Sequence, residues 1–170
     1  VPVSINNGYV MPAWYDILVM DLVRVEDAAG IRQSALAIEA LIANEVARGI
    51  QPANIVLAGF SQGCAMALHT GLRHANKLAG IMALSGYLPL ASTLAAERKP
   101  ANATTPIFMA HGTQDPVVPL ARAEDTRDAL QALGYAVDWN TYPMPHSLHP
   151  KEVADIGAFL RKVLAQKSTA

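Results

Sequence analysis

The sequence is poor in the features that mark several large classes of protein. Its single cysteine, Cys64, excludes an intramolecular disulfide framework and favours a reducing compartment. Only 16% of its residues are charged, and 13 basic against 14 acidic side chains give a net charge of −1, with no basic patch and no block of like charge. No apolar run reaches the length of a membrane span, and no signal-peptide pattern opens the chain. We therefore expect neither a nucleic-acid partner nor a membrane span.

Apolar residues, by contrast, are abundant, at 52% of a chain of 170 residues. This composition and length predict one domain, residues 1–170, with a sizeable core and no separate cap domain. After a loop over residues 1–12, apolar runs alternate with runs of helical periodicity, which predicts a parallel sheet covered by helices. The predicted strands are 54–60, 78–84, 106–110 and 135–142; the predicted helices are 27–48, 64–73, 119–133 and 150–164, with a short helix near 93–97.

The stretch Gly59-Phe60-Ser61-Gln62-Gly63 lies between the first predicted strand and a run of good helix formers. Strand, Gly-x-Ser-x-Gly and helix together are the setting of a nucleophile elbow. We expect glycine on both sides of Ser61 to remove Cβ atoms that would collide in so sharp a turn. The turn would lift the serine hydroxyl above the sheet, near the N-terminus of the next helix. A plainer alternative is a glycine-rich turn in which Ser61 only caps the helix.

Two further residues are expected at the same edge of the sheet as Ser61. Asp115 and His146 each follow a predicted strand, and active groups of parallel sheets lie beyond the carboxyl ends of the strands. A serine hydroxyl needs a base to remove its proton, and a histidine oriented by a buried carboxylate is suited to that task. The order serine, acid, histidine along the chain is the one found in α/β-hydrolases.

Other residues compete for these roles and are less well placed. Asp138 lies inside a predicted strand rather than beyond it, so Asp115 is the better acid. Of the other histidines, two lie on or after the elbow helix and should face away from the serine. One ends a strand and should hydrogen-bond a turn, and one directly precedes a proline that opens a helix; in that order they are His69, His74, His111 and His149. Cys64 is expected to be a packed small hydrophobic residue.

Two adjacent aromatic residues, Trp14 and Tyr15, stand beside a carboxylate in the N-terminal part of the chain. They are either a plug that packs this loop onto the core or a wall of an acyl or alcohol pocket. Both interpretations are open at the level of sequence. In the second one, Trp14 would contact the substrate.

Four segments together carry a resemblance to a known family: residues 11–16, 59–68, 111–119 and 142–146. They resemble the phospholipase/carboxylesterase family of α/β-hydrolases, which includes bacterial carboxylesterases and acyl-protein thioesterases, and the likeness covers nearly the whole chain. It implies a three-layer α/β sandwich with a mostly parallel sheet. It also implies Ser61 as nucleophile, Asp115 as orienting acid, His146 as base and the backbone N–H of Gln62 as an oxyanion donor. No metal and no organic cofactor are implied; small cytoplasmic enzymes, some of them homodimers, are typical.

The chain departs from the family pattern in two places. Pro145 precedes the histidine where family members usually have glycine. The family's first strands and its His-Gly-Leu-Gly-like loop, which supplies a second oxyanion N–H, would precede the residues that match Val1. An N-terminally truncated domain would leave 54–60 as an open sheet edge, and loss of one oxyanion donor costs about 3 kcal/mol.

Two hypotheses of different kinds follow from these observations. The first is a serine hydrolase that cleaves short-chain carboxylic esters or thioesters through an acyl-serine intermediate. The second is a non-catalytic or weakly active hydrolase-like fragment that binds acyl compounds or a partner.

Overall fold

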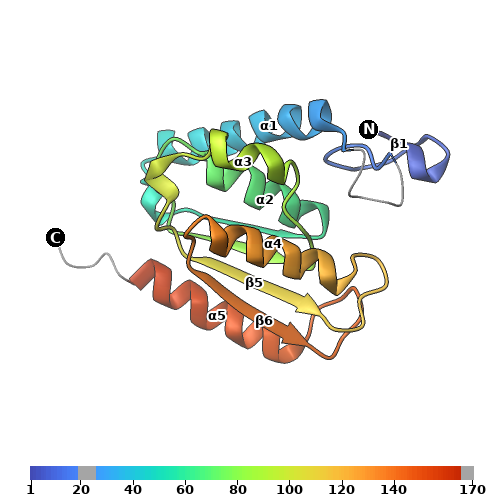
Figure 1. Cartoon of the computed structure of the whole chain (residues 1–170). Coiled ribbons are helices and arrows are strands. Elements are labelled where there is room, and N and C mark those ends of the chain that lie inside the picture. Colours follow the sequence, from blue (N-terminus) through green and yellow to red (C-terminus); the bar gives the residue numbers. More distant parts are fainter. Residues whose placement is uncertain (19–25, 166–170) are drawn as a thin grey trace.

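The computed structural model describes residues 1–18 and 26–165 and contains a parallel four-stranded sheet (Figure 1). The strands lie side by side in the order in which they occur along the chain. They are β3 (Val56–Phe60), β4 (Gly80–Leu84), β5 (Ile107–Gly112) and β6 (Val137–Tyr142). The predicted parallel sheet is therefore confirmed, and each strand lies within about two residues of its predicted position.

Helices cover both faces of this sheet and form a three-layer sandwich (Figure 1). One face of the sheet packs against α2, α3 and α4, and the other packs against α5, while α1 lies on α2. The helices are α1 (Ala28–Ala47), α2 (Gln62–Arg73), α3 (Ala91–Glu97), α4 (Leu120–Ala132) and α5 (Pro150–Ala165). All five were predicted from the sequence, α3 as a shorter segment.

The two central strands are buried on both faces, which explains their nearly continuous apolar sequences. Successive side chains of a strand point to opposite faces, so each strand serves two cores. In β4, Ile81 joins the core under α2, whereas Met82 joins the core under α5. In β5, Ile107 and Phe108 divide in the same way.

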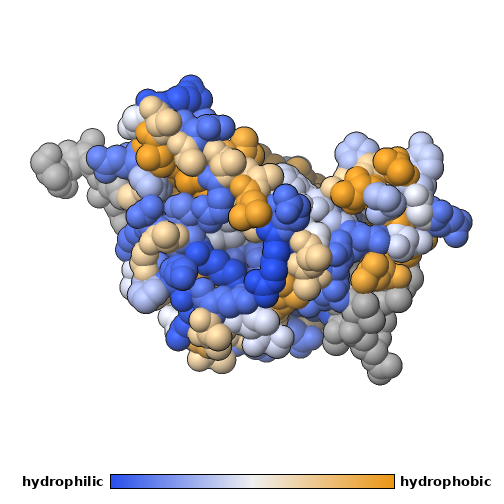
Figure 2. All heavy atoms as spheres, turned by 90° about the horizontal axis from the view of Figure 1, so that it is seen from above, coloured by the Kyte–Doolittle hydropathy of each residue, from blue (hydrophilic) through white to orange (hydrophobic). Residues whose placement is uncertain are grey.

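Helix α1 follows the predicted periodicity and packs against α2. Asp27 caps its N-terminus by accepting a hydrogen bond from the backbone N–H of Gly30 at 2.8 Å. Its inward side chains Ile31, Ile38 and Ile42 are buried. Figure 2, which views the molecule from the side of α1, shows hydrophobic side chains reaching the surface among polar ones. Three large apolar side chains of α1 are exposed: Leu36, Leu41 and Val46.

The first residues differ from the loop predicted for residues 1–12. Two short strands, β1 (Pro2–Val3) and β2 (Tyr9–Val10), pair in an antiparallel ladder. The chain reverses through Asn7 and Gly8, both of which have a positive φ. Strands of two residues are too short to show an alternating pattern, so these two could not be predicted from the sequence.

Within the described residues, β3 pairs with β4 alone and forms an edge of the sheet. The predicted open edge at 54–60 is thus confirmed for this strand. Beside it lies an apolar groove of about 350 Å³ between the strand and helices α1 and α2. No helix among residues 1–18 and 26–165 is both long enough and apolar enough to cross a membrane.

Candidate active site

Ser61 occupies a strained turn between the end of β3 and the start of α2. Its φ of 56° and ψ of −119° lie outside the regions that non-glycine residues usually adopt. Its backbone N–H donates to the carbonyl of Leu84 at 2.9 Å, which fixes the turn to the neighbouring strand. A Cβ atom on Gly59 would lie 2.0 Å from the carbonyl carbon of Gly63, so only glycine fits at that position.

Gly63, the second glycine of the motif, is not required for the steric reason that the sequence predicted. A Cβ atom on Gly63 would meet nothing within 4 Å, so the expected collision at this residue is wrong. The turn brings the backbone of Gly63 against the Cα of Gly59, and the clash therefore involves only the glycine before the serine. Gly86, beyond β4, adds a constraint that the sequence did not reveal, because its Cβ would lie 2.7 Å from the Ser61 carbonyl oxygen.

Asp115 and His146 are joined by a short hydrogen bond beyond the ends of β5 and β6. The Nδ1–H of His146 donates to Oδ2 of Asp115 at 2.7 Å, which leaves Nε2 as the acceptor nitrogen of the neutral ring. The other carboxylate oxygen accepts the backbone N–H groups of Val117 at 2.8 Å and Val118 at 2.9 Å. Burial opposes ionisation of Asp115, but these hydrogen bonds outweigh it and hold the pKa of the carboxyl below its usual value.

His146 is held beside the elbow by a loop that packs closely on the end of β5. A Cβ atom on Gly112 would lie 2.3 Å from the carbonyl oxygen of Met144 and 2.6 Å from that of Pro145. Pro145 therefore does not turn the loop away from the sheet. The His146 ring lies against Phe60, with ring centroids 4.7 Å apart, next to Ser61 in the chain. Among the described residues the Ser61 hydroxyl has no hydrogen-bond partner.

The other histidines lie where the sequence predicted. His111 is buried and donates from Nε2 to the carbonyl of Val118 at 2.8 Å, so it supports the turn that follows Asp115. His149 receives the Lys151 backbone N–H on its ring at the start of α5. His69 and His74 belong to α2 and its C-terminal cap, and His74 pairs with Glu39 on α1 at 2.8 Å.

Two hollows meet at Ser61. One is an apolar cavity of about 240 Å³, and the other is a wide, open depression that shares Ser61 and Gln62 with it. The cavity is lined by Ile5, Tyr15, Ile17, Ser61, Gln62, Tyr87, Pro116, Val117 and Val118. The depression is lined by Pro12, Ala13, Trp14, Ala58, Phe60, Ser61, Gln62 and Gly63.

The two aromatic residues of the N-terminal loop divide between these hollows. Trp14 is 39% exposed and borders the open depression. Tyr15 is buried, packs in the core between α1 and α2, and lines the cavity, where its hydroxyl lies 3.1 Å from that of Tyr87. Tyr15 is thus the packed plug that the sequence offered as one alternative, and it also lines the cavity next to Ser61; that this cavity binds an acyl group or alcohol stays a prediction. Tyr87 was not singled out, because its isolated position after a strand carries no motif.

Gln62 begins α2, and its backbone N–H is among the first N–H groups of a helix, which have no partner within the helix. The N–H groups at the start of a helix favour negative charge, so the position of Gln62 is compatible with the predicted role of an oxyanion donor. Cys64 is fully buried, and burial raises the pKa of its thiol, so it is not an activated nucleophile. Within residues 1–18 and 26–165 no group of three or more His, Cys, Asp or Glu side chains is arranged to hold a metal ion.

A parallel sheet covered by helices, with a serine on a strained strand-to-helix turn and a paired acid and histidine at the same edge, defines the α/β-hydrolase class. Residues 1–164 match the phospholipase/carboxylesterase family. The chain belongs to this family. Its members cleave esters or thioesters, so the chain is a hydrolase of that broad kind.

Relatives with sequences or structures similar to this chain are known from fungi and plants. Acyl-protein thioesterase 1 of Gibberella zeae is 46% identical over 176 residues, which cover 99% of this chain and 75% of the relative. The crystal structure of SOBER1 from Arabidopsis thaliana is 30% identical with a TM-score of 0.90, covering 96% of this chain and 79% of that one. Acyl-protein thioesterase 2 of Zea mays is 30% identical with a TM-score of 0.81, covering 96% and 77%.

Proposed function

We propose that this protein is a serine hydrolase that cleaves short-chain carboxylic esters or thioesters through an acyl-enzyme on Ser61. The observation that carries the proposal is the 2.7 Å hydrogen bond between His146 and Asp115 beside a strained Ser61. Nε2 of His146 takes the proton of the Ser61 hydroxyl as the oxygen attacks the substrate carbonyl. The same nitrogen then protonates the leaving alcohol or thiol, and it later activates the water that releases the acid.

The surrounding groups support this reaction in distinct ways. Asp115 orients the ring of His146 and stabilises its charged form, and its lowered pKa keeps it ionised. The backbone N–H of Gln62 donates to the oxyanion of the tetrahedral intermediate. The apolar cavity of about 240 Å³ suits the acyl chain, while the open depression beside Trp14 leaves room for the alcohol or thiol. The thioesterase names of the fungal and plant relatives favour thioesters among the substrates.

The test is labelling with a fluorophosphonate probe followed by peptide mapping, together with turnover of p-nitrophenyl butyrate. We expect labelling at Ser61, and we expect Ser61→Ala to lose about 10⁴-fold or more of the turnover without a change in circular dichroism. Ser147→Ala is the matched control, since Ser147 lies exposed in the histidine loop. Residual turnover of Ser61→Ala within tenfold of the parent would refute the role of Ser61.

The second candidate function is a weakly active or non-catalytic protein that binds acyl compounds. It is favoured by the apolar cavity beside Ser61, which would hold an acyl compound whether or not the serine reacts. Pre-steady-state kinetics separate the two candidates. A burst of p-nitrophenol equal to the enzyme concentration supports the hydrolase, whereas binding of an acyl ligand without burst or labelling supports the alternative.

A further inference from the structure

The side chain of Gln62 binds the backbone of the loop at Trp14 and Tyr15, almost fifty residues earlier in the chain. Its Oε1 accepts the backbone N–H of Trp14 at 3.1 Å, and its Nε2 donates to the backbone carbonyl of Tyr15 at 3.0 Å. One end of the side chain must accept and the other must donate, and only an amide supplies both. In a glutamate, a negatively charged oxygen would face the carbonyl oxygen of Tyr15 and repel it. The thioether of a methionine would satisfy neither the N–H of Trp14 nor the carbonyl of Tyr15.

Two other anchors tie the loop that Gln62 holds to the start of α1. The hydroxyl of Ser34 on α1 donates to the Trp14 carbonyl, and the N-cap Asp27 accepts the backbone N–H of Asp16 at 3.0 Å. Gln62 differs from both, because it belongs to the elbow itself. It is the only one of the three anchors that ties the loop to the nucleophile rather than to α1.

Trp14 and Tyr15, whose backbone groups Gln62 binds, each line one of the two hollows that meet at Ser61. Tyr15 lines the apolar cavity, and Trp14 borders the open depression. We propose that Gln62 is a positioning residue whose side chain holds the acyl-binding wall in register with the nucleophile, so that its loss affects long acyl chains more than short ones. This inference rests on the proposed function, because it assigns the cavity to the acyl chain.

A purely structural role for Gln62 would give a different result. If the side chain only stabilised the fold, its loss would lower the rate with every substrate by the same factor, through the fraction of folded protein. If it positions the wall, the loss must grow with the length of acyl chain that contacts Tyr15. The ratio of kcat/KM between two acyl lengths therefore separates the roles, and it does not depend on the active-enzyme concentration.

The experiment compares p-nitrophenyl acetate with p-nitrophenyl octanoate in the parent, Gln62→Met and Gln62→Glu. We expect kcat/KM for octanoate to fall about tenfold more than that for acetate, mainly through a higher KM. The effect should be larger in Gln62→Glu, because the carboxylate repels the Tyr15 carbonyl. Gln131→Met, at an exposed site on α4, is the matched control and should keep the parent's ratio.

Ser34→Ala provides an independent route to the same loop. It removes an anchor of Trp14 that lies on α1, so it should change the octanoate-to-acetate ratio in the same direction. Because both side chains hold one peptide segment, the double variant should lose less than the product of the single effects. If Gln62→Met left the octanoate-to-acetate ratio of kcat/KM unchanged, the inference would be overturned.

A second readout keeps this test separate from the proposed function. The chain has two tryptophans, so Trp139→Phe leaves Trp14 as the fluorescent reporter of the loop. Adding Gln62→Met to that background should shift the Trp14 emission, since the wall is released. An unchanged emission would refute the grip even in an active enzyme. A shifted emission in a protein that shows no turnover and no labelling would refute the hydrolase proposal and leave the grip established.

Discussion

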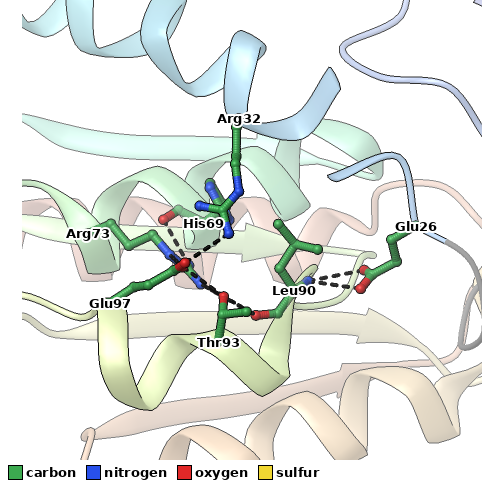
Figure 3. A network of polar contacts seen from close by, with 7 residues as sticks. All are labelled: Glu26, Arg32, His69, Arg73, Leu90, Thr93 and Glu97. Atoms are coloured by element: carbon green, nitrogen blue, oxygen red, sulfur yellow. Dashed lines mark hydrogen bonds and ion pairs between the residues drawn. The ribbon is translucent and has the colours of Figure 1, made fainter. Parts of the chain in front are cut away.

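Two polar clusters of this molecule are built from similar groups but differ in how completely their polar groups are hydrogen-bonded. The first is the pair Asp115–His146 beside Ser61. The second is an ion-pair network that joins α1, α2 and α3 (Figure 3). In the network, Glu97 is bonded at both oxygens, to Arg32 at 2.8 Å and to Arg73 at 2.6 Å.

The central residues of the network each have several partners. Arg73 also donates to Thr93 and to two backbone carbonyls, and Thr93 in turn donates to Glu97 at 2.7 Å. These contacts hold the pKa of Glu97 at about 2, chiefly through the hydrogen bond from Thr93. At Ser61, by contrast, the backbone is strained and the hydroxyl has no hydrogen-bond partner among the described residues. The comparison contrasts a cluster whose polar groups are densely paired with a candidate site in which one hydroxyl is left open.

The largest effect on this contrast should come from Asp115→Asn. An amide retains the shape of the side chain but cannot stabilise a charged His146, so we expect kcat to fall by about 10⁴-fold. Thermal stability should change far less than activity, because the backbone N–H groups of Val117 and Val118 keep an oxygen acceptor. Asp138→Asn is the control, since that exposed carboxylate lies within β6. Comparable losses in the two variants would show that Asp115 does not orient the histidine.

Gly112→Ala should be next in size. Its Cβ would meet the carbonyl oxygens of Met144 and Pro145, so the loop that carries His146 must move. Displacing a catalytic group by about 1 Å costs about 10²-fold in rate. Gly157→Ala in α5 is the control, because its Cβ meets only the tip of Arg161, and it should leave kcat unchanged. Full activity of Gly112→Ala would show that the loop tolerates the shift.

The structural network should respond in the opposite way. Glu97→Ala removes the acceptor that two arginines share. The side chain of Arg73 is only 12% exposed, so its charge would be left without this partner in a largely buried position. We expect the free energy of unfolding to fall by about 2 kcal/mol, measured in urea, while kcat stays within about twofold of the parent. Arg32→Ala is the control and should cost less than about 1 kcal/mol, because Arg32 is 51% exposed. A loss of activity larger than the loss of folded protein would link the network to the site.

Much of the site could be predicted from the sequence because its signals are local. Ser61 lies in a short motif with a strand before it and a helix after it, and Asp115 and His146 each follow a strand of the same parallel sheet. The carboxyl ends of such strands share one edge, so the topology brings these residues together without any knowledge of side-chain contacts. Asp138 could be set aside as the acid for the same reason, since it lies inside β6.

What could not be predicted depends on contacts between distant residues. The grip of Gln62 on Trp14 and Tyr15 spans almost fifty residues and leaves no periodic pattern. The need for glycine at position 112 arises from a loop more than thirty residues later. The Arg73–Glu97 pair likewise joins two helices through side chains whose types are common on any surface.

His69 offers the smallest effect and the finest test of the comparison, because it is a buried histidine without a catalytic role. Burial, followed by the charges of Arg73 and Arg32, lowers its pKa to about 4, and Glu97 opposes this shift. An unfolded histidine has a pKa of about 6.5, so between about pH 6.5 and 4 the unfolded chain binds the proton that the folded chain does not. Stability must therefore fall as the pH falls through this window.

Replacing His69 with leucine should remove this part of the acid sensitivity. We expect the parent to lose about 2 kcal/mol more than His69→Leu between pH 7 and pH 4.5, in urea unfolding at both values. At pH 7 the two proteins should differ by about 1 kcal/mol or less, because leucine fills a similar volume and Nδ1 of His69 has no partner among the described residues. Carboxylates that titrate in the same range affect both proteins alike, so the difference isolates His69. Parallel pH profiles would mean that the folded protein accepts the proton at this site, and the network around Arg73 would then tolerate a further positive charge.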